Sequence, residues 1–135
     1  MISIKLPWPP TVNTYYTVAR GRKILSKRGR TYKDDCAAEM LLQRPGKVAG
    51  RLRVRIDAFV PDRRKRDLDN LVKPVLDSLG SGPNALFDDD SQIDQLAVYR
   101  CPVAKPGFLR VYVRKLRADQ NLAILKDRED VLEVG

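Results

Sequence analysis

The alternation of apolar and charged residues in the segment 51–60, RLRVRIDAFV, which is strict as far as Ala58, is the feature that most constrains the fold. One side of an extended chain would carry the apolar residues Leu52, Val54, Ile56, Ala58 and Val60. The other side would carry Arg51, Arg53, Arg55 and Asp57. Because successive side chains of a strand point to opposite faces, the pattern predicts a half-buried β-strand over 51–60.

A helical pattern follows over 67–80, DLDNLVKPVLDSLG. The apolar positions that recur at helical spacing are Leu68, Leu71, Val72, Val75, Leu76 and Leu79. Gly80 stands where a glycine often follows the last turn of a helix. Pro74 removes one backbone hydrogen bond, so we expect a bend near the first turns.

The remaining segments predict an α+β domain without internal repeats. Further strands are expected over 2–6, 92–100 and 107–116, and another helix over 31–43. Seven lysines and arginines, with no acid, lie between 20 and 33 beside Gly21 and Gly29, which suggests a mobile basic loop or a hairpin. The segment 118–135 contains five acids and only two basic residues, so it is distinguished from the domain as an acidic, polar tail.

Size and charge exclude most other classes of protein. The chain has 135 residues and a mass of 15.3 kDa, enough for one domain with a single core. Its formal net charge of +9 makes a polyanion, and nucleic acid in particular, the expected partner. No apolar run approaches the roughly 20 residues that a membrane span needs, and 1–10 does not resemble a signal peptide, so we expect a cytoplasmic protein without a membrane partner.

The absence of histidine restricts the chemistry further. Without it the chain cannot use a histidine general base or a histidine-bound zinc ion. Cys36 and Cys101 are far apart in sequence and form no CxxC pair, which argues against a zinc or redox motif. Any hydrolysis must therefore rely on carboxylates, lysine and a hard metal ion.

Two aspartates flank a leucine directly after the densest basic run, RRKR at 63–66. If Asp67 and Asp69 lie in an extended segment that enters the helix, both carboxylates project to one side, and Lys73 lies one helical turn further on. Two carboxylates about 5 Å apart repel by roughly 3 kcal/mol at an effective dielectric constant near 20, so cations or a metal must lie nearby. The alternative is structural: Asp69 would cap the helix, and Asp67 would pair with Arg64 or Arg66. Lys73 would then be an exposed ion-pair partner of Asp69 or Asp77.

A second acidic cluster, FDDDSQID at 87–94, supplies further oxygen ligands. It begins like a calcium-binding loop, but Ile93 stands where that loop needs glycine and Tyr99 where it needs glutamate. The alternative is a solvated turn before a strand. Three hard oxygen donors drawn from two segments would suit Mg²⁺ or Mn²⁺.

Three separated stretches closely resemble one known family. They are LPWPPTVNTYY at 6–16, PDRRKRDLDNLVKPVLDSL at 61–79 and FDDDSQI at 87–93. In this order and at this spacing they are similar to the RusA family of Holliday junction resolvases, which prophages often carry. The resemblance covers roughly residues 1–116 and therefore leaves the tail without a counterpart.

The resemblance implies a single small α+β domain over 1–117, with a mixed sheet packed against helices. It also implies a Mg²⁺-dependent homodimeric endonuclease that nicks four-way DNA junctions at symmetric positions, with Mn²⁺ as a substitute metal. The matching positions make Asp67, Asp69 and Asp90 the catalytic acids and metal ligands, with Asp89 as the alternative to Asp90. Lys73 is the matching catalytic lysine.

Two basic groups are expected to bind DNA. They are Arg20, Arg22, Lys23, Lys27, Arg28 and Arg30, and Arg63, Arg64, Lys65 and Arg66, with the stripe on 51–55 as a further contact. Trp8, Tyr15 and Tyr16 could stack on bases, although packing against the core or a partner subunit is the simpler role. Two other functions stay open: a DNA-binding module without catalysis, and a Mg²⁺-dependent nucleotide phosphohydrolase.

Overall fold

The computed structural model describes residues 1–117. The expected acidic tail, 118–135, lies outside the described residues. The elements in chain order are β1 (Ile2–Pro7), α1 (Val12–Tyr15), β2 (Tyr16–Ala19), β3 (Arg22–Leu25), α2 (Lys27–Gln43), β4 (Leu52–Phe59), α3 (Asp69–Leu79), the 3₁₀ helix η1 (Asp90–Gln92), β5 (Ile93–Cys101) and β6 (Phe108–Lys115). The predicted strands and both predicted helices, over 31–43 and 67–80, are thus confirmed to within a few residues.

Four strands form a mixed sheet in the order β1-β6-β4-β5. β4 pairs in parallel with β5 and antiparallel with β6, and β6 pairs antiparallel with β1. The parallel pair requires a crossover, and α3 and η1 lie within it. The fold is therefore the α+β domain with a mixed sheet that the sequence predicts.

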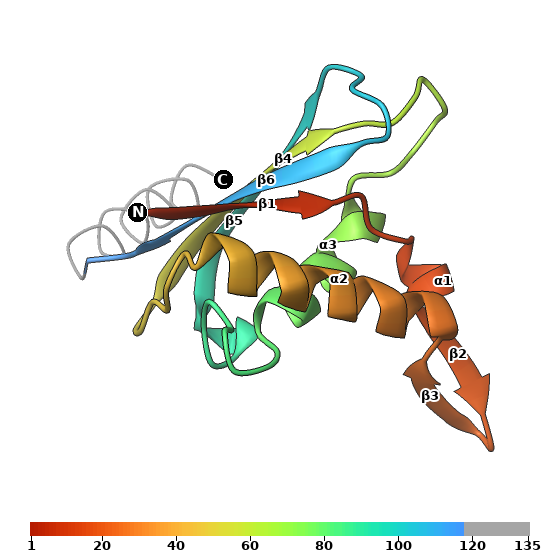
Figure 1. Ribbon diagram of the computed structural model, residues 1–135, viewed down its shortest axis with the longest axis horizontal. Coiled ribbons are helices and arrows are strands. Elements are labelled where there is room, and N and C mark those ends of the chain that lie inside the picture. Colours follow the sequence, from red (N-terminus) through yellow and green to blue (C-terminus); the bar gives the residue numbers. More distant parts are fainter. Residues whose placement is uncertain (118–135) are drawn as a thin grey trace, which may run out of the picture.

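Helices α2 and α3 cover one face of this sheet (Figure 1). The alternation in β4 explains why: Leu52, Val54 and Ile56 are fully buried under the helices, together with Met40 of α2 and Leu79 of α3. Burial of such side chains contributes roughly 1.5–3 kcal/mol each. The arginines of β4 lie on the opposite face.

Asp57 on that opposite face departs from the simple pattern, because it is buried. Its carboxylate accepts two hydrogen bonds from the Arg55 guanidinium, at 2.9 and 3.2 Å. The same guanidinium lies 5.0 Å from the ring of Tyr99 and 5.7 Å from that of Tyr112. Part of the arginine stripe thus serves the fold.

The basic segment 20–33 divides into two elements. Strands β2 and β3 form the expected hairpin, which extends away from the sheet in Figure 1. Its turn has positive φ angles at Arg20 and Gly21, 53° and 73°. Helix α2 then begins at Lys27, four residues earlier than predicted.

The side chain of Ser26 sets this earlier start, because it accepts a hydrogen bond from the Gly29 amide at 3.0 Å and so caps α2. Gly29 itself is required by a close approach, since a Cβ there would overlap the carbonyl oxygen of Tyr15. A glycine that resembles a loop signal in the sequence is thus a packing residue inside a helix.

Gly80 also has a different role from the expected one. Its φ angle is −92°, so it does not supply a left-handed cap. A Cβ at this position would lie 2.9 Å from a ring carbon of the buried Phe87. Gly80 therefore lets the chain after α3 pack against Phe87.

The aromatic residues near the N-terminus pack against the core, as the simpler interpretation holds. Tyr15 is fully buried and meets Tyr16 edge to face, with ring centroids 4.9 Å apart. Trp8 is half-buried and contacts the core. Within residues 1–117 no helix has the length and apolar character needed to span a membrane.

Candidate active site

One contact brings the two acidic segments together. The Lys73 ammonium lies 3.3 Å from a carboxylate oxygen of Asp90, although the two residues are 17 positions apart in sequence. Lys73 projects from α3, and Asp90 begins η1. Lys73 does not pair with Asp69 or Asp77, which the structural alternative required.

Asp89 and Asp90 have different surroundings. The Asp89 carboxylate accepts a hydrogen bond from the Ser91 amide at 2.9 Å and caps η1, whereas Asp90 contacts Lys73. The hydrogen bonds from Ser91 lower the pKa of Asp89. The geometry therefore assigns Asp89 to the local turn and leaves Asp90 facing α3.

Gln92 fixes this turn against the sheet. Its side-chain oxygen accepts from the amides of Asp88 and Asp89, at 2.8 and 3.0 Å, and its side-chain nitrogen donates to the Gly50 carbonyl at 2.9 Å. In the sequence, Gln92 stands out only as part of the motif at 87–93. The D-x-x-Q spacing of Asp89 and Gln92 is the signal of a reciprocal cap that would have identified its role.

Asp67 and Asp69 lie at the start of α3, and both are exposed. Leu68 between them has helical angles, with φ −62° and ψ −33°, and Asp69 is the first residue of the helix. The expectation that both acids lie in an extended segment is therefore wrong, because Leu68 already has helical angles and the helix begins at Asp69 itself. A carboxylate in the first turn is favourable beside the positive end of the helix dipole.

Neither acid has a partner among the described residues. Asp69 makes no capping hydrogen bond through its side chain, and within residues 1–117 no ion pair or side-chain hydrogen bond involves Asp67 or Asp69. The structural alternative is therefore wrong for both. The arginines expected to pair with Asp67 contact another acid instead.

That other acid is Asp62, which the sequence analysis did not single out. The Arg66 guanidinium donates to it at 2.6 Å, and the Arg64 amide donates at 2.9 Å. These two hydrogen bonds lower the pKa of Asp62 to about 2. Through these two hydrogen bonds Asp62 fixes the conformation of the basic run 63–66, which directly precedes Asp67.

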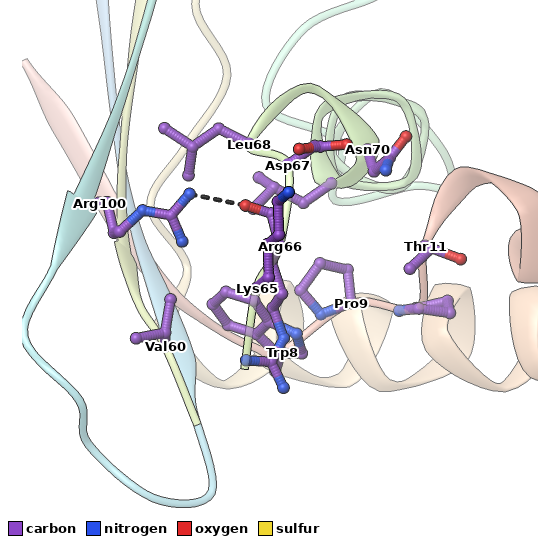
Figure 2. Close-up of a pocket in the computed structure, with 12 residues that line it drawn as sticks. Trp8, Pro9, Thr11, Val60, Lys65, Arg66, Asp67, Leu68, Asn70 and Arg100 are labelled. Carbon is purple, nitrogen blue, oxygen red and sulfur yellow. Dashed lines mark hydrogen bonds between the residues drawn. The ribbon is translucent and has the colours of Figure 1, made fainter. Parts of the chain in front are cut away.

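A second anchor comes from β5. Arg100 donates a hydrogen bond to the backbone carbonyl of Arg66 at 2.6 Å, drawn as a dashed line in Figure 2. The Arg66 guanidinium also lies 5.8 Å from the Trp8 ring centre. The segment that carries the first acids is therefore fixed to both the sheet and the N-terminal segment.

A pocket of about 300 Å³ opens beside Asp67 (Figure 2). The segment 8–11 and the segment 65–71 form most of its lining, and Val60 and Arg100 complete it. Trp8 and Pro10 also line a shallower hollow together with Lys27 and Arg28 of α2. The segment 8–11 therefore lies between the two predicted basic groups and lines a hollow next to each of them.

The basic residues expected to bind DNA are mostly exposed. Arg20, Arg22 and Lys23 lie on the β2–β3 hairpin, and Lys27, Arg28 and Arg30 lie on the first turn of α2. Lys23 stacks over Tyr16 at 4.3 Å, and Arg30 donates to the Leu25 carbonyl at 2.9 Å. Those two side chains also support the fold of the hairpin.

The oxygen donors fit a hard cation in their chemistry. Asp67, Asp69 and Asp90 offer carboxylate oxygens, which Mg²⁺ and Mn²⁺ prefer. In the conformation described for residues 1–117, no three His, Cys, Asp or Glu side chains converge closely enough to hold a metal ion. Asp90 thus pairs with Lys73 of α3. Asp67 and Asp69 lie at the start of the same helix and have no side-chain partner among the described residues.

Comparisons with known proteins show the family to which the chain belongs. The family model of endodeoxyribonuclease RusA matches residues 7–114. Crossover junction endodeoxyribonuclease RusA of Escherichia coli K12 is 38% identical over 116 residues, covering 84% of this chain and 94% of the relative. The protein of the same name from Enterobacteria phage 82 is 38% identical over 117 residues, covering 84% of this chain and 93% of the relative.

The domain thus combines a mixed sheet covered by two helices with two exposed aspartates at the start of α3 and a third that faces Lys73. The chain belongs to the RusA family of endodeoxyribonucleases. The matched range, 7–114, includes all three acids and the lysine.

Proposed function

We propose that this protein is a crossover junction endodeoxyribonuclease, which cuts four-way DNA junctions by hydrolysis of phosphodiesters. The observation that carries the proposal is the contact between Lys73 and Asp90 beside two unpartnered aspartates. Relatives named crossover junction endodeoxyribonuclease match 84% of the chain, which supports the choice of substrate. The enzyme would act on DNA in the cytoplasm.

We propose that Asp67, Asp69 and Asp90 hold Mg²⁺, for which Mn²⁺ could substitute. When bound, the metal would activate water and stabilise charge on the scissile phosphate. The chain's own contribution is to expose all three carboxylates to solvent. Asp90 lies beside the Lys73 ammonium, and Asp67 follows directly after the basic run 63–66.

Lys73 would act as a fixed positive charge rather than as a base. Partial burial lowers the pKa of Lys73, but the hydrogen bond and the charge of Asp90 outweigh that effect, so the pKa is raised. The ammonium therefore stays protonated at neutral pH. In that form it can orient Asp90 and stabilise negative charge on the phosphate.

The two basic groups would bind the DNA backbone. The exposed run 63–66 is adjacent to Asp67, and the hairpin and the first turn of α2 extend the positive surface past the segment 8–11. A protein that neutralises several phosphates releases counterions, so affinity should fall steeply with salt. Replacement of Arg63, Arg64 and Lys65 by glutamine should make that dependence shallower.

We further propose that the working enzyme is a homodimer. Resolving a junction into two duplexes needs two nicks at symmetric positions, and one chain supplies one set of acids. A twofold dimer supplies the second set and matches the approximate symmetry of the junction. Mixed dimers of active and Asp69→Asn chains should nick one strand only, and a monomer by light scattering would contradict the proposal.

The main experiment compares a mobile four-way junction with a linear duplex of the same sequence, in Mg²⁺ and in EDTA. We expect paired nicks in the junction only, and only with Mg²⁺. Junction binding without cleavage at any Mg²⁺ concentration would favour the DNA-binding module. Release of phosphate from nucleotides with no cut in DNA would favour the phosphohydrolase.

A further inference from the structure

The pocket beside Asp67 contains groups that metal-assisted cleavage does not need. Its walls combine apolar surface from Trp8, Pro10 and Leu68 with polar groups from Lys65 and Asn70 (Figure 2). An apolar cavity with a few polar groups is the usual form of a site for a flat organic ligand. A phosphate alone would need the cations but not the ring or the prolines.

Asn70 has the one amide side chain in this lining. Within the described residues 1–117 its side chain makes no hydrogen bond, although it is half-buried. Its backbone amide donates to the Asp67 carbonyl at 3.2 Å, so the residue is tied to the catalytic segment. An asparagine side chain presents one acceptor and two donors, the pattern that reads the edge of a base.

The walls are held in place before any ligand binds. Arg100 holds the Arg66 backbone at 2.6 Å, and Asp62 holds the Arg66 side chain at the same distance. The Tyr32 hydroxyl donates to the Pro7 carbonyl at 2.9 Å and fixes the start of the segment 8–11. A site held in this way loses little conformational freedom on binding, which favours specific recognition.

We propose that this pocket receives one nucleobase next to the scissile phosphate and that Asn70 reads its edge. The inference rests on the proposed function and extends it to the choice of cleavage sequence. A base near the crossover has lost part of its stacking, so it can leave the helix at lower cost than a base inside a duplex. Trp8 and Pro10 would replace the lost stacking, and Lys65 would hold the adjoining phosphate.

The position of the pocket supports this assignment. Asp67 belongs both to the pocket lining and to the acids that would hold the metal. A phosphate at Asp67 therefore places the attached nucleotide at the mouth of the pocket. The nicking position would then depend on which base enters it.

The test first maps the nick in a junction and then replaces single bases within two nucleotides of it by abasic sites. Binding is measured in EDTA, which prevents cleavage. For the parent chain we expect one position at which base removal lowers affinity about tenfold, and little effect elsewhere. In Asn70→Ala that difference should largely vanish, because the two changes remove the same interaction.

Cleavage provides the second measurement. Junctions with each of the four bases at that position should be cut by the parent at rates that differ about tenfold, and Asn70→Ala should reduce those differences. Asn84→Ala removes the same amide from an exposed loop away from the pocket and serves as the matched control. Lys65→Gln should weaken binding equally for all four bases.

The outcomes separate this inference from the proposed function. If the parent cuts junctions but Asn70→Ala keeps the full base preference and the full effect of the abasic site, the pocket does not read a base. If the parent never cuts, the proposed function fails; the abasic sites are then placed in turn at each position around the crossover, and binding in EDTA still decides whether the pocket takes a base. An abasic effect that is absent at every position overturns the inference.

Discussion

The two ends of helix α3 carry aspartates with opposite surroundings. At the C-terminal end, Asp77 accepts a hydrogen bond of 2.5 Å from the Tyr15 hydroxyl and lies 3.2 Å from the Lys33 ammonium. At the N-terminal end, Asp69 is exposed and has no side-chain partner among the described residues. The same residue type thus serves the fold at one end and is available to a ligand at the other.

The difference shows where to look for function on a charged surface. An acid that is satisfied inside the fold stabilises it, and its loss leaves its donors unpaired. An exposed acid without a partner destabilises the fold little, because water solvates its carboxylate. The full negative charge of that carboxylate is then available to a bound cation. Asp90 lies between these cases, because its carboxylate forms an ion pair with Lys73, itself a candidate catalytic group.

The largest effect is expected from the acids themselves. Asp67→Asn, Asp69→Asn and Asp90→Asn should each lower junction cleavage by about a hundredfold or more, because each would remove one of the proposed metal ligands. Junction binding should stay within a few-fold of the parent, since the phosphate-binding surface is unchanged. Single-turnover cleavage and filter binding measure the two quantities.

Two further variants serve as controls for this prediction. Asp88→Asn, which removes a carboxylate that pairs with Lys47 on the surface, should leave cleavage unchanged. Asp89→Asn should lose some thermal stability but retain cleavage, because its carboxylate caps η1. A rate above about a tenth of the parent's in any of the first three variants would remove that residue from the set of ligands.

A smaller but still large effect is expected at Lys73. Lys73→Gln should reduce cleavage by about ten- to a hundredfold, whereas Lys73→Arg should retain more activity because it keeps the charge. Because the pKa of Lys73 is raised, its ion pair with Asp90 is complete below its usual pKa and is lost only as pH rises through a higher value. The cleavage rate should therefore show no loss from Lys73 deprotonation between about pH 6 and pH 9.

A stability effect without loss of catalysis is expected at the other end of α3. Tyr15→Phe should lower the free energy of unfolding by about 1–2 kcal/mol, because it breaks the hydrogen bond to Asp77. Burial, followed by the hydrogen bond to Asp77, raises the pKa of Tyr15, so the hydroxyl stabilises the fold below pH 10 and that stability is lost at higher pH. Urea unfolding at pH 7 and pH 11 checks this, and cleavage should be unchanged.

The smallest effect is expected at Asp62, the partnered acid of the basic run. Asp62→Asn should lower the melting temperature slightly at neutral pH and raise junction Kd modestly, because Arg66 loses its anchor. The depressed pKa, about 2, means that the stabilising contribution is present above the usual pKa of an aspartate and is lost as pH falls through about 2. A melting-temperature difference that grows on acidification from pH 5 would contradict this assignment.

Most elements could be predicted from the sequence because their signals are local. The alternation at 51–60 and the helical spacing at 68–79 each reflect one buried face, and the structure contains β4 and α3 there. The start of α2 was missed because Gly29 suggests a loop, whereas a distant contact with Tyr15 requires that glycine. A close approach between segments leaves no periodic pattern in the sequence.

The sequence singles out the candidate acids, but the tertiary structure decides their surroundings. The motifs at 61–79 and 87–93 single out the aspartates, and the resemblance assigns Asp90 ahead of Asp89. The contact between Lys73 and Asp90, the reciprocal cap of Asp89 with Gln92 and the pairing of Arg66 with Asp62 appear only when the chain folds. Charged side chains pair according to their separation in space, and their separation along the chain does not determine that distance.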